Sequence, residues 1–122
     1  MRFTQDLTPG VNVVRSYAAG EFRIGDRLIK GGVIVSAGEI LVEPQMRVVE
    51  DLAEAHAKRV LSLQPEVVLL GTGARQVFPA PAFAAHFLRA GIGFEVMDSG
   101  AACRTFNVLV AERRRAVAVL LP

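Results

Sequence analysis

The chain has 122 residues, of which 52% are hydrophobic and 21% are charged, and its formal net charge is +2. This composition excludes a disordered chain and suits one domain, 1–122, with one core. The small net charge gives no reason to expect a nucleic-acid partner. Charged residues interrupt every apolar window well before the roughly 18 residues of a spanning helix, and the first ten residues lack the apolar region of a signal peptide. We therefore expect a cytoplasmic domain with no transmembrane segment.

Cysteine and histidine are too few for the usual metal and disulfide chemistry. One cysteine cannot form an internal disulfide, and one cysteine with two histidines cannot supply an ordinary structural zinc site. No carboxylates stand at a spacing that indicates a metal. We expect no metal and no other cofactor.

The first third of the chain has a β pattern. Residues 1–10 show little periodicity and are expected to be an arm or edge segment. From Val11 onward β-branched and aromatic residues alternate with polar ones, and Ala19-Gly20 and Gly25-Asp26 are suited to tight turns. This pattern continues to Val35 and predicts antiparallel strands.

The period changes in residues 44–63. Apolar side chains there recur at spacings of three and four, which predicts a helix that Pro65 terminates. His56 falls on the apolar face, where a hydrogen-bonded core histidine is the expected role.

An unbroken apolar run, Val67-Val68-Leu69-Leu70, ends at Gly71-Thr72-Gly73. Four consecutive apolar residues indicate a strand buried on both faces, near the centre of a sheet. Ligands of open α/β sheets collect at the carboxyl ends of strands, so the glycine turn is the place to look for a site.

The rest of the chain alternates between helix and strand. The predicted elements are a helix opened by Pro79-Ala80-Pro81 and ending near residue 90, strand 92–97, helix 101–111 and strand 116–121. Either Asp98 or Ser99 could cap the last helix. This alternation predicts an α/β layer whose sheet is at least partly parallel.

Three segments carry a resemblance to a known family. They are Leu-Leu-Gly-Thr-Gly at 69–73, Gly-Ile-Gly-Phe-Glu-Val-Met-Asp-Ser at 91–99, and Ala-Ala-Cys-Arg-Thr-Phe-Asn-Val-Leu-Val-Ala-Glu at 101–112. Together they resemble the small-domain family that includes mitochondrial NADH dehydrogenase (complex I) assembly factor 3 and bacterial and archaeal proteins of unassigned function. The resemblance implies a single three-layer (β+α/β/α) domain with a mixed sheet and an extra N-terminal antiparallel β layer. It also implies an assembly or interaction role without established enzymatic activity.

The chain departs from this family after its last helix. The family usually has glycine after the glutamate, whereas here Glu112 is followed by Arg113. If the backbone there is left-handed, a non-glycine residue costs about 1 kcal/mol. The run Arg113-Arg114-Arg115 is typical of a solvated turn.

Two features could bind a ligand. Glycines at Gly71 and Gly73 could expose N–H groups to an anion, although the same residues also permit a tight strand exit and close packing. On the last helix Cys103 and Asn107 share a face. Cys103 is either a low-pKa thiol near the helix N-terminus or a small buried hydrophobe, and Arg104 either anchors its helix to an acidic side chain or contacts an acidic ligand.

No complete catalytic set is present, so we expect a non-enzymatic protein-interaction or assembly/accessory factor with an unidentified protein partner. The high apolar content also makes a homo-oligomer an expectation. The alternative is a small-molecule or anion binder, or an enzyme, that uses a strand-end cleft. The candidate ligand-binding residues for that alternative are Gly71, Thr72, Gly73, Asp98, Ser99, Cys103, Arg104 and Asn107.

Overall fold

The computed structural model describes residues 10–122, so the arm expected at residues 1–10 lies, except for Gly10, outside the described residues. A three-stranded sheet contains β1 (Val14–Ala18), β2 (Glu21–Ile24) and β3 (Arg27–Lys30). A five-stranded sheet contains β4 (Gly32–Ser36), β5 (Ile40–Glu43), β6 (Val67–Thr72), β7 (Gly93–Met97) and β8 (Ala116–Leu121). The helices are η1 (Val49–Asp51), α1 (Glu54–Leu61), α2 (Pro81–Leu88) and α3 (Ser99–Ala111).

The three-stranded sheet is an antiparallel meander, as the alternation predicts. Ala19 and Gly20 both have positive φ, 52° and 75°, which is the geometry of a type I′ hairpin turn. Gly25, with φ 57°, turns the chain between β2 and β3. Both predicted turns are present.

The five-stranded sheet is mixed, with strand order β5-β4-β8-β6-β7. Its β6 strand runs parallel to β7 and β8, whereas β4 runs antiparallel to β5 and β8. The four interior residues of β6 are buried, which agrees with the prediction from the apolar run. The carboxyl ends of β6, β7 and β8 therefore meet at one edge of the sheet.

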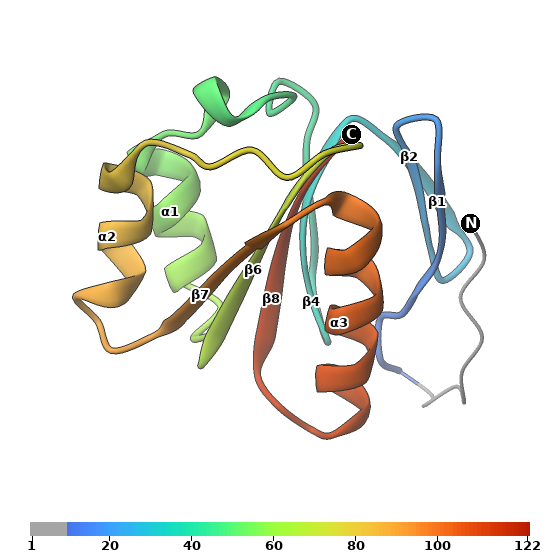
Figure 1. The fold of residues 1–122 in the computed structure, drawn as a ribbon. Helices are drawn as coiled ribbons and strands as arrows, with labels where there is room; N and C mark the ends of the chain where they lie inside the picture. The colour runs from blue at the N-terminus through green and yellow to red at the C-terminus, as the bar shows by residue number, and fades with distance from the viewer. Residues whose placement is uncertain (1–9) are drawn as a thin grey trace.

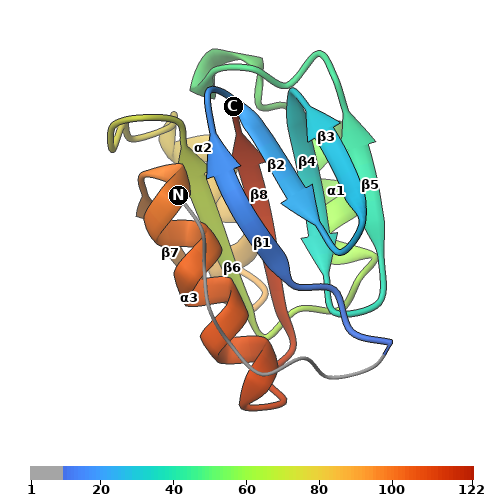
Figure 2. The ribbon, with the colours of Figure 1, turned by 90° about the vertical axis from the view of Figure 1, so that its right-hand side faces the viewer.

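The molecule has three layers (Figures 1 and 2). Helices α1 and α2 cover one face of the five-stranded sheet, and α3 together with the three-stranded sheet covers the other. Alternate side chains of β8 enter the two cores, because successive residues of a strand point to opposite faces. This arrangement confirms the predicted fold class, a mixed α/β domain with an extra N-terminal β layer.

The helix predicted over residues 44–63 is wrong in its first half. The structure has only the short η1 there, and α1 begins at Glu54. The Asp51 carboxylate accepts the backbone N–H groups of Arg47 and Val48 at 3.0 Å each, and His56 Nδ1 accepts the N–H of Ala53 at 3.0 Å. Such side-chain acceptors favour a turn and a new helix start over a continuous helix. His56 is hydrogen-bonded, as expected, but it is half-buried at the start of α1 and is not the core residue that the apolar spacing predicts.

Candidate functional site

Gly71 lies where α3 crosses the carboxyl end of β6. A Cβ atom at this position would stand 2.9 Å from both Ala102 Cβ and Ser99 Cα. These distances are too short for a side chain, so glycine is what allows α3 to approach the strand so closely. Gly73 has φ 89°, and its N–H donates to Ser99 Oγ at 2.8 Å. The two glycines therefore permit a tight exit from the strand and close packing of α3. These were the alternatives to anion binding.

Ser99 joins three elements at this edge of the sheet. Its hydroxyl donates to the carbonyl oxygen of Leu121 at 2.6 Å while accepting the Gly73 N–H. Its own backbone N–H donates to the carbonyl oxygen of Gly73 at 2.8 Å. The side chain is fully buried. Ser99 thus ties the first turn of α3 to the ends of β6 and β8.

Thr72 folds the following loop back over the strand end. Its hydroxyl donates to the carbonyl oxygen of Arg75 at 2.6 Å and accepts the backbone N–H of Val77 at 3.0 Å. Gln76 of the same loop donates from Nε2 to the carbonyl oxygen of Val96 at 2.9 Å. Three hydrogen bonds of the Thr72 and Gln76 side chains therefore tie residues 75–77 of this loop to β6 and β7.

Cys103 does not have the surroundings of a reactive thiol. It is fully buried, and burial raises the pKa of its thiol to about 12, although the charge of Arg104 acts in the opposite direction. Asp98 caps α3 through its carboxylate, which accepts the Ala101 N–H at 2.9 Å, and it opposes thiolate formation. Arg104 itself is exposed on α3. Of the two roles considered for Cys103, the structure favours the small buried hydrophobe.

This environment predicts slow alkylation of Cys103 in the native protein. At pH 8 iodoacetamide should modify the folded protein at least about a hundredfold more slowly than the urea-unfolded chain, since only the thiolate reacts. The Cys103 thiol has a pKa of about 12 in the folded protein and 9.0 as its ordinary value, so it ionises first in the unfolded chain. The free energy of unfolding should therefore fall as the pH rises from 9.0 toward about 12. Equal rates in the folded and unfolded protein at pH 8 would instead identify a reactive thiol.

Asn107 is a buried side chain that links α3 to the three-stranded sheet by hydrogen bonds. Its Oδ1 accepts the backbone N–H of Val14 and its Nδ2 donates to the Val14 carbonyl oxygen, both at 2.9 Å. Only 5% of the Asn107 surface is exposed. The amide that was a candidate ligand contact is thus paired with the backbone of β1.

The structure brings Gly71, Thr72, Gly73, Asp98 and Ser99 together at one edge of the sheet. Cys103 and Asn107 lie farther along α3, inside the core between α3 and the three-stranded sheet, so the eight candidates do not line one common cleft. The polar groups that meet at the edge bond mainly to one another and to backbone.

Outside that bonded edge lie two loops, the segment before α1 and the segment after β6 (Figure 1). They border a hollow of about 230 Å³. The exposed apolar side chains of these loops include Val48, Val77 and Phe78, which are 51%, 38% and 70% exposed. We call these three residues, with the neighbouring Arg47 and Arg75, the loop surface.

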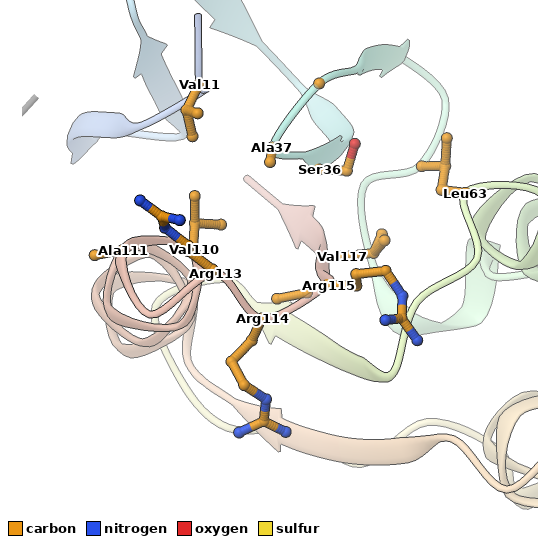
Figure 3. A pocket seen from close by; sticks show the side chains of 12 residues that line it. Val11, Ser36, Ala37, Leu63, Val110, Ala111, Arg113, Arg114, Arg115 and Val117 are labelled. Atoms are coloured by element: carbon orange, nitrogen blue, oxygen red, sulfur yellow. The ribbon is translucent and has the colours of Figure 1, made fainter. Parts of the chain in front are cut away.

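A larger cavity, of about 540 Å³, lies near the start of β8 (Figure 3). We call it the arginine pocket; its lining residues are Val11, Ser36, Ala37, Gly38, Leu63, Val110, Ala111, Arg113, Arg114, Arg115, Ala116 and Val117. The three arginines are exposed, as expected of a solvated turn, but the cavity beside them was not predicted. The available signal was an arginine run placed directly between a helix and a buried strand.

Residues 10–122 contain neither a metal-binding cluster nor a membrane-spanning helix. No group of three or more histidine, cysteine, aspartate or glutamate side chains in this range could hold a metal ion. In the same part of the chain, every helix is too short or too polar to cross a membrane.

The fold is that of a small three-layer α/β domain. The glycine turn at residues 71–73 serves packing at the carboxyl ends of the strands. The chain belongs to the family described as "Protein of unknown function (DUF498/DUF598)", which matches residues 14–121. It is 32% identical to a protein of Bordetella parapertussis whose crystal structure superposes with a TM-score of 0.85, covering 95% of this chain and 99% of that one.

The chain is also similar to proteins of animals and of other bacteria. The chain is 33% identical over 112 residues to NADH dehydrogenase (ubiquinone) 1 alpha subcomplex assembly factor 3 of Danio rerio, covering 90% of this chain but only 64% of that protein. It is 27% identical over 108 residues to a "13 kDa major membrane protein" of Francisella tularensis, covering 88% of each chain. The resemblance drawn from the sequence is confirmed.

Proposed function

We propose that this domain is a non-enzymatic assembly or accessory factor that binds a protein partner through the loop surface. The observation that carries the proposal is the 70% exposure of Phe78 in a loop whose backbone is held by hydrogen bonds. Aromatic anchors of this kind dominate the energy of many protein interfaces. The similarity to an assembly factor from Danio rerio favours the same role.

The ordered loop favours binding for a physical reason. Hydrogen bonds of the Thr72 and Gln76 side chains tie residues 75–77, directly before Phe78, so this part of the loop loses little conformational entropy when a partner covers it. Val48 and Val77 are exposed apolar residues that border the hollow, and Val77 directly precedes Phe78 in the chain.

The surroundings of this apolar area indicate the chemistry of the partner. Two basic residues, Arg47 and Arg75, and one acidic residue, Glu50, also border the hollow, and this balance favours a partner with an apolar side chain and an acidic group beside it. The cytoplasmic location and the homo-oligomer expected from the sequence stay predictions.

Phe78→Ser is expected to abolish capture of a specific partner while leaving the fold intact. Tagged wild-type and variant proteins would be compared by affinity purification from the source cell and quantitative mass spectrometry. Leu88→Ser is the matched control, because Leu88 is 61% exposed but lies at the far end of α2. The proposal predicts proteins that Leu88→Ser retains and Phe78→Ser loses. Identical partner sets for the two variants, or no enriched protein with the wild type, would contradict it.

A further inference from the structure

The arginine pocket is set between the end of α3, the start of β8 and the turn after β4 (Figure 3). Its apolar lining includes Val11, Ala37, Val110 and Val117. A volume of about 540 Å³ is within the range of pockets that hold small organic molecules. Among residues 10–122, three arginines line it and no acidic side chain does, so the electrostatic preference of this lining is for an anion.

The three arginines differ in what they bind. Arg114 donates from Nε to Glu66 Oε1 at 3.1 Å, and Figure 3 shows its side chain pointing away from the pocket. Arg115 donates from its backbone N–H to the same carboxylate at 2.9 Å and from Nε to the Gln64 carbonyl oxygen at 3.2 Å. These contacts lower the pKa of Glu66, the Arg115 backbone bond most of all.

Arg113 has different surroundings. Within residues 10–122 its guanidinium makes no hydrogen bond or ion pair of this kind. Figure 3 shows it beside Val110, directed toward the side of the pocket where Val11 lies. It is therefore the pocket arginine whose charge is available to a ligand.

The backbone of Arg113 is also unusual. Its φ is 63°, and its N–H donates to the Val110 carbonyl oxygen while the Arg114 N–H donates to that of Leu109, both at 2.9 Å. This pattern is a Schellman motif, whose left-handed position strongly favours glycine. An arginine there lowers stability, and residues held in unfavourable backbone conformations concentrate at functional sites.

We propose that the arginine pocket binds a small organic anion with an apolar tail, its carboxylate or phosphate head at Arg113 and its tail against Val110, Val117 and Ala37. The pocket lies away from the loop surface, so this inference is independent of the proposed protein partner. A cationic side chain also suits a helix C-terminus, and the experiment must separate that role from ligand binding.

The test uses decanoate and decyl phosphate as probes and the full chain, followed by ¹H–¹⁵N NMR. Saturable shifts are expected at Ala37, Gly38, Val110 and Ala116. Arg113→Gly should weaken binding about tenfold or more, because a charge-assisted contact is lost. The same change should raise the melting temperature by about 3–6 °C, since glycine relieves the left-handed strain. Loss of affinity in a more stable protein cannot be attributed to unfolding.

Two further variants separate charge from backbone. Arg113→Gln should lose affinity as Arg113→Gly does, but without the gain in melting temperature. Arg89→Gln, which removes an exposed arginine at the end of α2, should bind as the wild type does. The proposal is overturned if neither probe shifts these amides, if decyltrimethylammonium binds equally well, or if Arg113→Gly keeps wild-type affinity. Equal affinity for inorganic phosphate and decyl phosphate would overturn the role of the tail.

Discussion

Asn107→Ala is expected to lower the free energy of unfolding by about 2–5 kcal/mol, because it leaves two buried backbone groups without partners and opens a small cavity. Both groups belong to Val14, which is itself fully buried, and both bonds are 2.9 Å long. The loss should appear as a lower midpoint in urea unfolding. These two hydrogen bonds add to the apolar core that packs the three-stranded sheet against α3, so the amides of β1 should also exchange faster with solvent when the bonds are lost.

Asn12→Ala is the matched control. Asn12 also makes two side-chain bonds to backbone, donating from Nδ2 to the carbonyl oxygens of Ser36 at 2.9 Å and Glu39 at 3.2 Å, but it is only partly buried. Water can replace these bonds, so a loss of no more than about 1 kcal/mol is expected. Equal losses of unfolding free energy for the two variants would mean that the burial of the Asn107 hydrogen bonds does not increase their contribution to stability.

Ser99→Ala should lower the free energy of unfolding by about 2–4 kcal/mol. The change leaves the Gly73 N–H and the Leu121 carbonyl oxygen without the Ser99 hydroxyl in a region that water does not reach. Ser62→Ala removes a comparable 2.6 Å bond to a backbone carbonyl, that of Arg59, at an exposed helix end, and should cost less than about 0.5 kcal/mol. If Ser99→Ala lowered the free energy of unfolding as little as this control, the Ser99 hydroxyl would not be needed to link α3 to β6 and β8. A ligand role for its hydroxyl would then regain support.

Much of the fold follows from local patterns in the sequence. Periods of two and of three to four separate strands from helices, and the turn at Ala19-Gly20 depends on residues that are adjacent in the chain. The prediction over 44–53 fails because apolar spacing carries no information on hydrogen bonding by Asp51 and His56 to nearby backbone.

The candidate site was harder to predict. The glycine turn and the Asp98-Ser99 pair do meet at the strand ends, as parallel strands require. The partners of the polar groups are distant in sequence, however: Asn107 and Val14 are 93 residues apart. Whether a hydroxyl or an amide is available to a ligand depends on such contacts, which a single sequence does not reveal.

The arginine pocket was missed for the same reason. Arg113 is adjacent in sequence to a helix end, which is sufficient to predict a turn. Its neighbour Val11 comes from the other end of the chain. The cavity beside the arginine run forms only when the N-terminal segment packs near α3 and β8.

Photocrosslinking from position 78 tests the central claim, that the domain acts through a protein bound at the loop surface, most directly. With p-benzoylphenylalanine in place of Phe78 in the source cell, the account predicts a discrete crosslinked product with one partner, absent when the same probe replaces Leu88. Products that are absent at position 78, or the same at both positions, would contradict it.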